Sequence, residues 1–117
     1  MMQINETSSG VLVLTLTAKR IDAASAVHFK DDFREATAAH SGRVVMDLGS
    51  VTFMDSSGLG AMVAALKAMG GRKLELCKMT AAVDKVFRLT RMDKVFLLHA
   101  DVEHALSFND SKDVDAA

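Results

Sequence analysis

The sequence predicts a single α/β domain, in which a mixed sheet of four to five strands is packed against about four helices. Two observations lead to this prediction. The chain has 117 residues, half of them hydrophobic and a quarter charged, which is typical of one globular domain. Short β-rich segments also alternate with helix-length segments, and parallel strands require connections of that length.

The first segments predict a hairpin followed by an amphipathic helix. Residues 2–7 and 11–17 (VLVLTLT) form candidate strands, separated by the turn sequence Ser-Ser-Gly. A helix is expected from about Ala23 to Ala39, because apolar residues recur there at helical spacing and charged residues fill the other face. Asp22 is a candidate cap for this helix, and Ser41-Gly42 ends it.

The central segments predict a buried strand and a weakly polar helix. Residues 43–48 (RVVMDL) form the strand, in which Asp47 is the one conspicuous polar residue. The helix runs from Ser57 to Met69 and carries one charged side chain, Lys67, so most of its surface should be covered. Gly70-Gly71 should end it.

The last third predicts further strands and helices of the same sheet. Strands are expected at residues 73–78 and 95–98, a helix around residues 83–90 and a final helix around residues 102–106. The domain is thus assigned to residues 1–108. Residues 109–117 are polar and acidic, and we expect them to form a disordered tail.

Composition excludes several classes of function. The formal net charge is −1 and the basic residues are scattered, so binding to nucleic acid is not indicated. The apolar stretch 60–70 is far shorter than the ~20 residues that cross a bilayer, so direct membrane insertion is not expected. The N-terminus does not resemble a secretory signal, and the single cysteine, Cys77, is expected to be a buried thiol, so a cytoplasmic location is predicted.

The sequence Asp-Ser-Ser-Gly at residues 55–58 joins the central strand to the weakly polar helix. The N-terminus of a helix favours negative charge, so a phosphoserine in its first turn would be tolerated. On the local pattern alone, a simpler interpretation is favoured, in which Asp55 or Ser56 is an N-cap and the glycines ease a tight turn.

A wider resemblance gives this junction a functional interpretation. Residues 44–66 (VVMDLGSVTFMDSSGLGAMVAAL) resemble the central signature of the STAS domain, and most closely that of stand-alone bacterial anti-sigma factor antagonists. The likeness extends to residues 20–25 upstream and 90–96 downstream, and covers nearly all of residues 4–108. Arg91 and Met92 depart from the Gly-Leu that the family commonly has.

The resemblance implies a phosphorylation switch. The second serine of the motif, Ser57, would be phosphorylated by a serine kinase and dephosphorylated by a PP2C-type phosphatase, and the unphosphorylated form would bind the kinase or anti-sigma protein. Asp22 matches an acidic residue that lies near this serine in the family, although a capping role is an equal alternative. Asp47 matches a strand-end aspartate of the family, which implies that it orders the following loop by hydrogen bonds. The residues predicted to contact partners are Asp22, Met54, Asp55, Ser56, Ser57, Gly58, Leu59 and Met62.

Other chemistry is not supported by the sequence. No phosphate-binding loop with its lysine and no serine-hydrolase elbow is present, so we predict no catalytic residues and no cofactor. The four histidines show no ligand spacing with each other or with Cys77, so no metal is predicted. The alternative function is a constitutive scaffold subunit of a lipid-transport or stress-signalling complex, and an enzyme of unknown type is a distant third.

Overall fold

The computed structural model describes residues 1–108, so the predicted tail at 109–117 lies outside the described residues. The described part is one α/β unit with a five-stranded mixed sheet, as predicted. Its strands and helices follow one another in this order: β1 (Met2–Glu6), β2 (Leu12–Leu16), β3 (Arg20–Ile21), α1 (Ala26–Thr37), β4 (Val44–Asp47), β5 (Phe53–Met54), α2 (Ser56–Ala68), β6 (Glu75–Cys77), α3 (Ala81–Leu89), the 3₁₀ turn η1 (Met92–Lys94), β7 (Leu97–His99) and α4 (Val102–Ser107).

The main sheet has the strand order β1-β2-β4-β6-β7. β1 and β2 form the predicted antiparallel hairpin, whose turn includes Gly10 at a φ of +86°. All other neighbours in this sheet are parallel, because each pair is joined by a crossover through a helix. The carboxyl ends of β2, β4 and β6 therefore lie at the same edge of the sheet.

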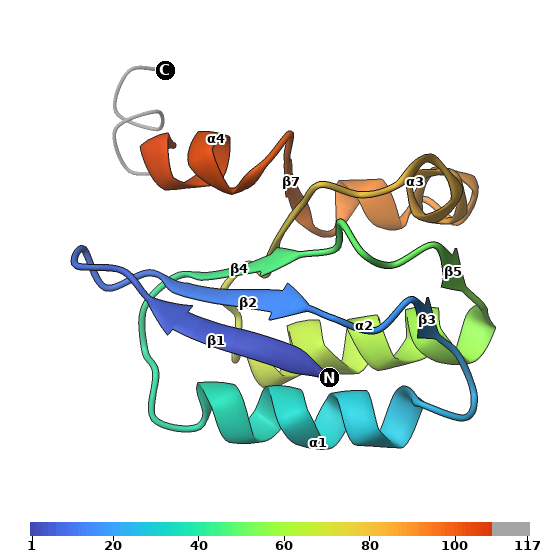
Figure 1. Ribbon diagram of the computed structural model, residues 1–117, viewed down its shortest axis with the longest axis horizontal. Helices are drawn as coiled ribbons and strands as arrows, with labels where there is room; N and C mark the ends of the chain where they lie inside the picture. The colour runs from blue at the N-terminus through green and yellow to red at the C-terminus, as the bar shows by residue number, and fades with distance from the viewer. Residues whose placement is uncertain (109–117) are drawn as a thin grey trace.

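Helices cover both faces of the sheet (Figure 1). On one face, the leucines of β2 and the apolar residues of β4 and β6 pack against α1 and α2, with the phenylalanines at positions 29 and 33 fully buried. On the other face, α4 contributes Ala105 to a smaller cluster with Val11, Val13, Val45 and Cys77. The alternation of side chains along β2 thus supplies both cores.

Several boundaries differ from the prediction. α1 begins at Ala26 rather than near Ala23, because residues 22–25 form a separate turn: the Asp22 N–H donates to the Ser25 hydroxyl at 3.0 Å and the Ser25 N–H donates to the Asp22 carboxylate at 3.3 Å. The last strand begins at Leu97, because the preceding residues belong to η1 and its cap. α2 ends before Gly70 and Gly71, whose φ angles of +64° and +93° explain why glycines end it.

Arg91 stands where the resemblance to STAS domains implies a glycine. α3 ends at Leu89, and Arg91 follows with a φ of 63°, which is the left-handed conformation that glycine usually supplies after a helix. The loop therefore makes the same turn without glycine. For a residue other than glycine, this left-handed backbone conformation costs about 1 kcal/mol.

Candidate functional site

The candidate site is the first turn of α2. A small sheet that the sequence analysis missed, with two strands of two residues each, positions this turn. β3 and β5 pair in parallel, with Ile21 beside Met54. The Asp55 N–H then donates to the Ile21 carbonyl at 3.4 Å. Strands this short carry no periodicity that sequence analysis could detect. Their pairing holds the segment before α1 against the segment before α2.

Asp55 is the N-cap of α2, as the capping interpretation predicted. Its backbone is extended, and Oδ1 accepts a hydrogen bond from the Gly58 N–H at 2.9 Å. Oδ2 accepts from the Ala23 N–H at 3.2 Å. One carboxylate therefore ties the first turn of α2 to the turn before α1, so these two segments form one surface.

Gly58 allows α2 to approach β3 closely. A Cβ at this position would lie 2.0 Å from the Ile21 carbonyl oxygen and 2.7 Å from the Ile21 carbonyl carbon. Both are backbone atoms that cannot rotate away. Glycine is therefore required here for packing between backbones. Gly60, in contrast, has nothing within 4 Å of its Cβ position.

Ser56 and Ser57 occupy the first two positions of α2, and both are exposed. The first N–H groups of a helix lack intrahelical acceptors and carry the positive end of its dipole. A negative group on Ser57 would lie in this favourable field. The hydroxyl of Ser57 makes no hydrogen bond to the other described residues 1–108.

Two carboxylates, those of Asp22 and Asp55, and the Arg20 guanidinium lie around the turn. The Arg20 Nε donates to Asp22 Oδ2 at 3.1 Å, and this ion pair, with the hydrogen bonds from Ser25, holds the pKa of Asp22 below its usual value. The Arg20 guanidinium also lies 4.1 Å from the ring centroid of Phe53, which is 39% exposed. Sequence reasoning missed Phe53, although its place directly before Met54 and the motif was a usable signal.

The other residues predicted to contact partners are less accessible. Met54 is 5% exposed and Met62 is 0% exposed, so both lie in the core and the prediction that they contact a partner is corrected. Gly58 is buried and Leu59 is half-buried. The buried face of α2 includes Ala61 and Ala65, because small residues let α2 pack closely.

Asp47 orders the loop after β4, as predicted. Its Oδ1 accepts from the Gly49 N–H at 2.8 Å, and the loop then leads to β5. Thr80 adds a second contact to this loop, since its hydroxyl donates to the Val51 carbonyl at 2.7 Å. These bonds fix the path of the chain into the candidate site.

A buried polar cluster that the sequence analysis missed lies beneath α4, apart from the candidate site. Glu75 accepts two hydrogen bonds from Arg43, at 2.6 and 2.8 Å, and contacts His99 Nε2 at 2.8 Å. Arg43 also donates to the carbonyl groups of Ala105 and Phe108. Burial raises the pKa of Glu75, but Arg43 and His99 outweigh it and the net shift is downward. The cluster ties the end of α4 to the sheet.

Comparison with known proteins identifies the family. A family model for the STAS domain matches residues 3–105. The chain belongs to the STAS domain family. The resemblance predicted from the sequence is thereby confirmed. Within residues 1–108, the structure contains no helix that is long and apolar enough to span a membrane.

Solved structures of STAS proteins share this fold. An anti-sigma factor antagonist from Mycobacterium paratuberculosis is 24% identical, with a TM-score of 0.80 over 92% of this chain and 91% of that one. An anti-sigma-factor antagonist (STAS) domain protein from Planctomyces limnophilus is 22% identical, with a TM-score of 0.78 over 90% and 93%. The Bacillus cell fate determinant SpoIIAA in its phosphorylated form is 15% identical, with a TM-score of 0.60 over 99% and 98%.

Proposed function

We propose that this STAS domain protein is a phosphorylation-regulated anti-sigma factor antagonist of a partner-switching pathway in the cytoplasm. The form with unmodified Ser57 binds a serine kinase or anti-sigma protein. The kinase transfers phosphate to Ser57, which weakens the complex, and a PP2C-type phosphatase restores the binding form. In this scheme the protein is a substrate and a binding partner, and ATP enters with the kinase.

The observation that carries the proposal is the position of Ser57. It is exposed at the second position of a helix, on a turn that Asp55, Gly58 and the β3–β5 pair fix from three sides. Its hydroxyl takes no part in holding that turn. Ser57 is therefore accessible to another protein's active site, and its modification requires no rearrangement of the turn.

The expected effect of phosphate is electrostatic. A phosphoserine adds about −1.5 to −2 charges at neutral pH. Asp22 and Asp55 already place two carboxylates around this turn, and the exposed ring of Phe53 lies beside them. A partner that docks on the turn would have to bury the added dianion, which costs several kcal/mol and lowers affinity by about tenfold or more.

The test is an affinity pull-down from the native cytoplasm with wild type, Ser57→Ala and Ser57→Asp as parallel baits, combined with phosphosite mapping. We expect Ser57→Ala to retain an ATP-binding serine kinase or anti-sigma protein and Ser57→Asp to lose it. Ser56→Ala is the matched control, because Ser56 is also exposed, one residue earlier, and its loss should leave phosphorylation unchanged.

Other outcomes of this experiment have defined meanings. The same partners on all baits, with no phosphate on the wild-type protein, would favour the constitutive scaffold subunit of a lipid-transport or stress-signalling complex. Phosphate on Ser56 in place of Ser57 would refute the assignment of the switch residue while keeping the regulated site.

A further inference from the structure

A second surface lies at the open edge of the main sheet, where β1 pairs with β2 alone. The Thr7 N–H donates to the Val11 carbonyl, and the Thr17 N–H donates to the Met1 carbonyl. In an antiparallel pair such bonds recur at every second residue, so the backbone groups of Met2, Ile4 and Glu6 face away from β2. These groups form a row of donors and acceptors at the edge.

The edge lacks the features that usually prevent strand pairing. Proteins commonly protect an edge strand with lysine, proline or a β-bulge. β1 (MQINE) contains no lysine and no proline, its one charged residue, Glu6, is its last residue, and its register with β2 runs without a bulge from Met2 to Glu6. Ile4 is 57% exposed. The edge is therefore available for an added strand.

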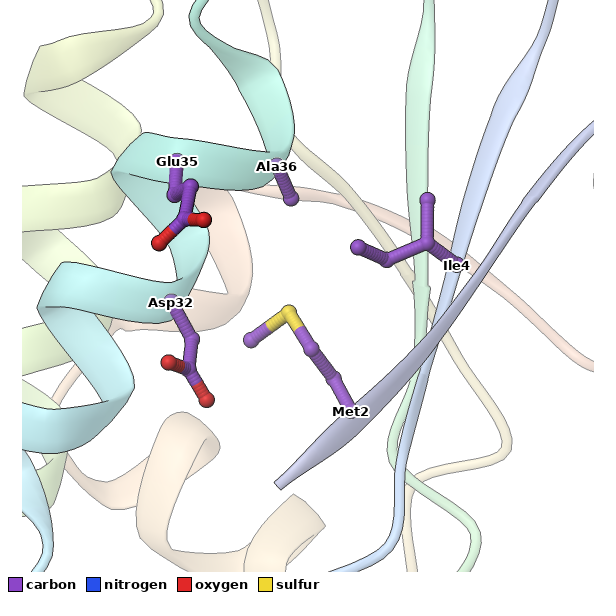
Figure 2. A pocket seen from close by; sticks show the side chains of 5 residues that line it. All are labelled: Met2, Ile4, Asp32, Glu35 and Ala36. Carbon is purple, nitrogen blue, oxygen red and sulfur yellow. The ribbon is translucent and has the colours of Figure 1, made fainter.

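A hollow beside this edge would receive the side chains of such a strand. It has a volume of about 450 Å³ and lies between β1 and α1, lined by Met2, Ile4, Asp32, Glu35 and Ala36. Figure 2 shows the side chains of Met2 and Ile4 reaching from the strand toward the helix, with the two carboxylates on the opposite wall. The hollow thus has an apolar floor and an acidic wall.

The charges of the hollow favour one kind of occupant. Asp32 lies 3.9 Å from the Met1 amino group and 3.5 Å from His28. Glu35 has no cationic group within 4 Å among residues 1–108. A second copy that paired through β1 would bring a second Glu35 and no lysine or arginine from its own β1. A basic partner complements this surface, and a second copy does not.

We propose that β1 and the hollow bind an extended, basic segment of a partner protein, which adds to the sheet as a strand. Lysine or arginine side chains at alternate positions of that segment reach Glu35 and Asp32, and their methylene groups pack on Met2 and Ile4. This surface is separate from Ser57, and the proposal does not rest on the phosphorylation switch.

The test measures fluorescence anisotropy of a dye-labelled, end-blocked peptide that alternates Arg and Val, added to the full chain. We expect saturable binding that Glu35→Lys weakens by about tenfold, since it replaces an attraction with a repulsion. Glu103→Lys is the matched control, because Glu103 is an exposed glutamate on α4, at the other face of the sheet, and does not line the hollow. It should change affinity by less than about threefold.

A second variant examines the backbone contribution. Ile4→Pro removes a donor that faces the open edge and none that pairs with β2, so it should also weaken binding. Thermal unfolding checks that this variant folds, and Glu35→Lys remains decisive if it does not. The proposal would be overturned if the wild type did not bind the peptide or bound a Glu-Val peptide equally well. It would also be overturned by equal losses of affinity in Glu35→Lys and Glu103→Lys, or by a wild-type dimer that Ile4→Pro dissociates.

Discussion

The contact between Gly58 and Ile21 predicts that one glycine of α2 is irreplaceable while its neighbour is not. In Gly58→Ala, the new methyl group would be placed 2.0 Å from the Ile21 carbonyl oxygen. Because an ordinary contact between carbon and oxygen is more than 1 Å longer, α2 and β3 must separate, roughly as in an overpacked core. Gly60→Ala places the same methyl group in open space.

The two substitutions should have opposite effects on the free energy of unfolding. Overpacking destabilises the fold by about 3 kcal/mol, and the higher helix propensity of alanine offsets about 1 kcal/mol of this. Gly58→Ala should therefore lower the free energy of unfolding by about 2 kcal/mol. In Gly60→Ala only the helix propensity changes, so the free energy of unfolding should rise by up to about 1 kcal/mol. For a domain of this size, these changes correspond to a fall in Tm of about 8 °C and a rise of about 4 °C.

Thermal unfolding followed by far-ultraviolet circular dichroism is the suitable assay, since the chain has no tryptophan or tyrosine. Gly60→Ala controls for the effect of adding a methyl group to the first turns of α2. If Gly58→Ala unfolded at the same temperature as Gly60→Ala or above it, the close approach of α2 to β3 would be wrong. The fixed geometry proposed for the Ser57 turn would then lose its main support.

Three other predictions follow from individual residues. Arg91→Gly should raise stability in chemical denaturation by about 1 kcal/mol, because φ at this position is 63°, and an unchanged midpoint would contradict that conformation. Glu75→Gln should cost about 3 kcal/mol at pH 7, because it removes the charge of a buried carboxylate that pairs with Arg43 and His99. Since the pKa of Glu75 is lowered on folding, the stabilisation that its charge gives is present above about pH 4.5 and is lost as pH falls through the folded-state pKa, so wild type and variant should converge in acid unfolding experiments. Burial, with Asp47 and Asp101 nearby, raises the pKa of Cys77 to about 12, so a thiol reagent at pH 8 should label the folded protein far more slowly than the unfolded chain.

The sequence was sufficient to predict the order of the main elements, because each long element has a clear period. The run VLVLTLT alternates between two buried faces, and the amphipathic pattern that contains Phe29 and Phe33 marks α1. Asp55 was recognisable as a cap because its type and its place before an apolar helix are a local signal. These features depend on neighbouring residues alone.

The parts that were missed depend on contacts between distant residues. The pairing of Ile21 with Met54 joins strands of two residues each, too short for any pattern. Met54 and Met62 were expected at a partner surface because they flank the motif, but their burial depends on how α2 is rotated against the sheet. In the Glu75 cluster, Arg43 and His99 lie 32 and 24 residues from Glu75 in the chain, and none of the three residues has a local sequence pattern that indicates the cluster.

The structure assigns the stability of the candidate turn to other residues than the one proposed to be modified. Asp55 supplies the cap, Gly58 the close packing and Ile21 the accepting carbonyl. The Ser57 hydroxyl makes no hydrogen bond to the described part of the chain. A hydroxyl that is exposed, unbonded and in a field that favours negative charge has no evident structural purpose, so a requirement for serine at position 57 would have to come from a partner. For the same reason Ser57→Ala should change binding and modification without changing the fold, which makes it a suitable variant for separating the proposed switch from the scaffold alternative.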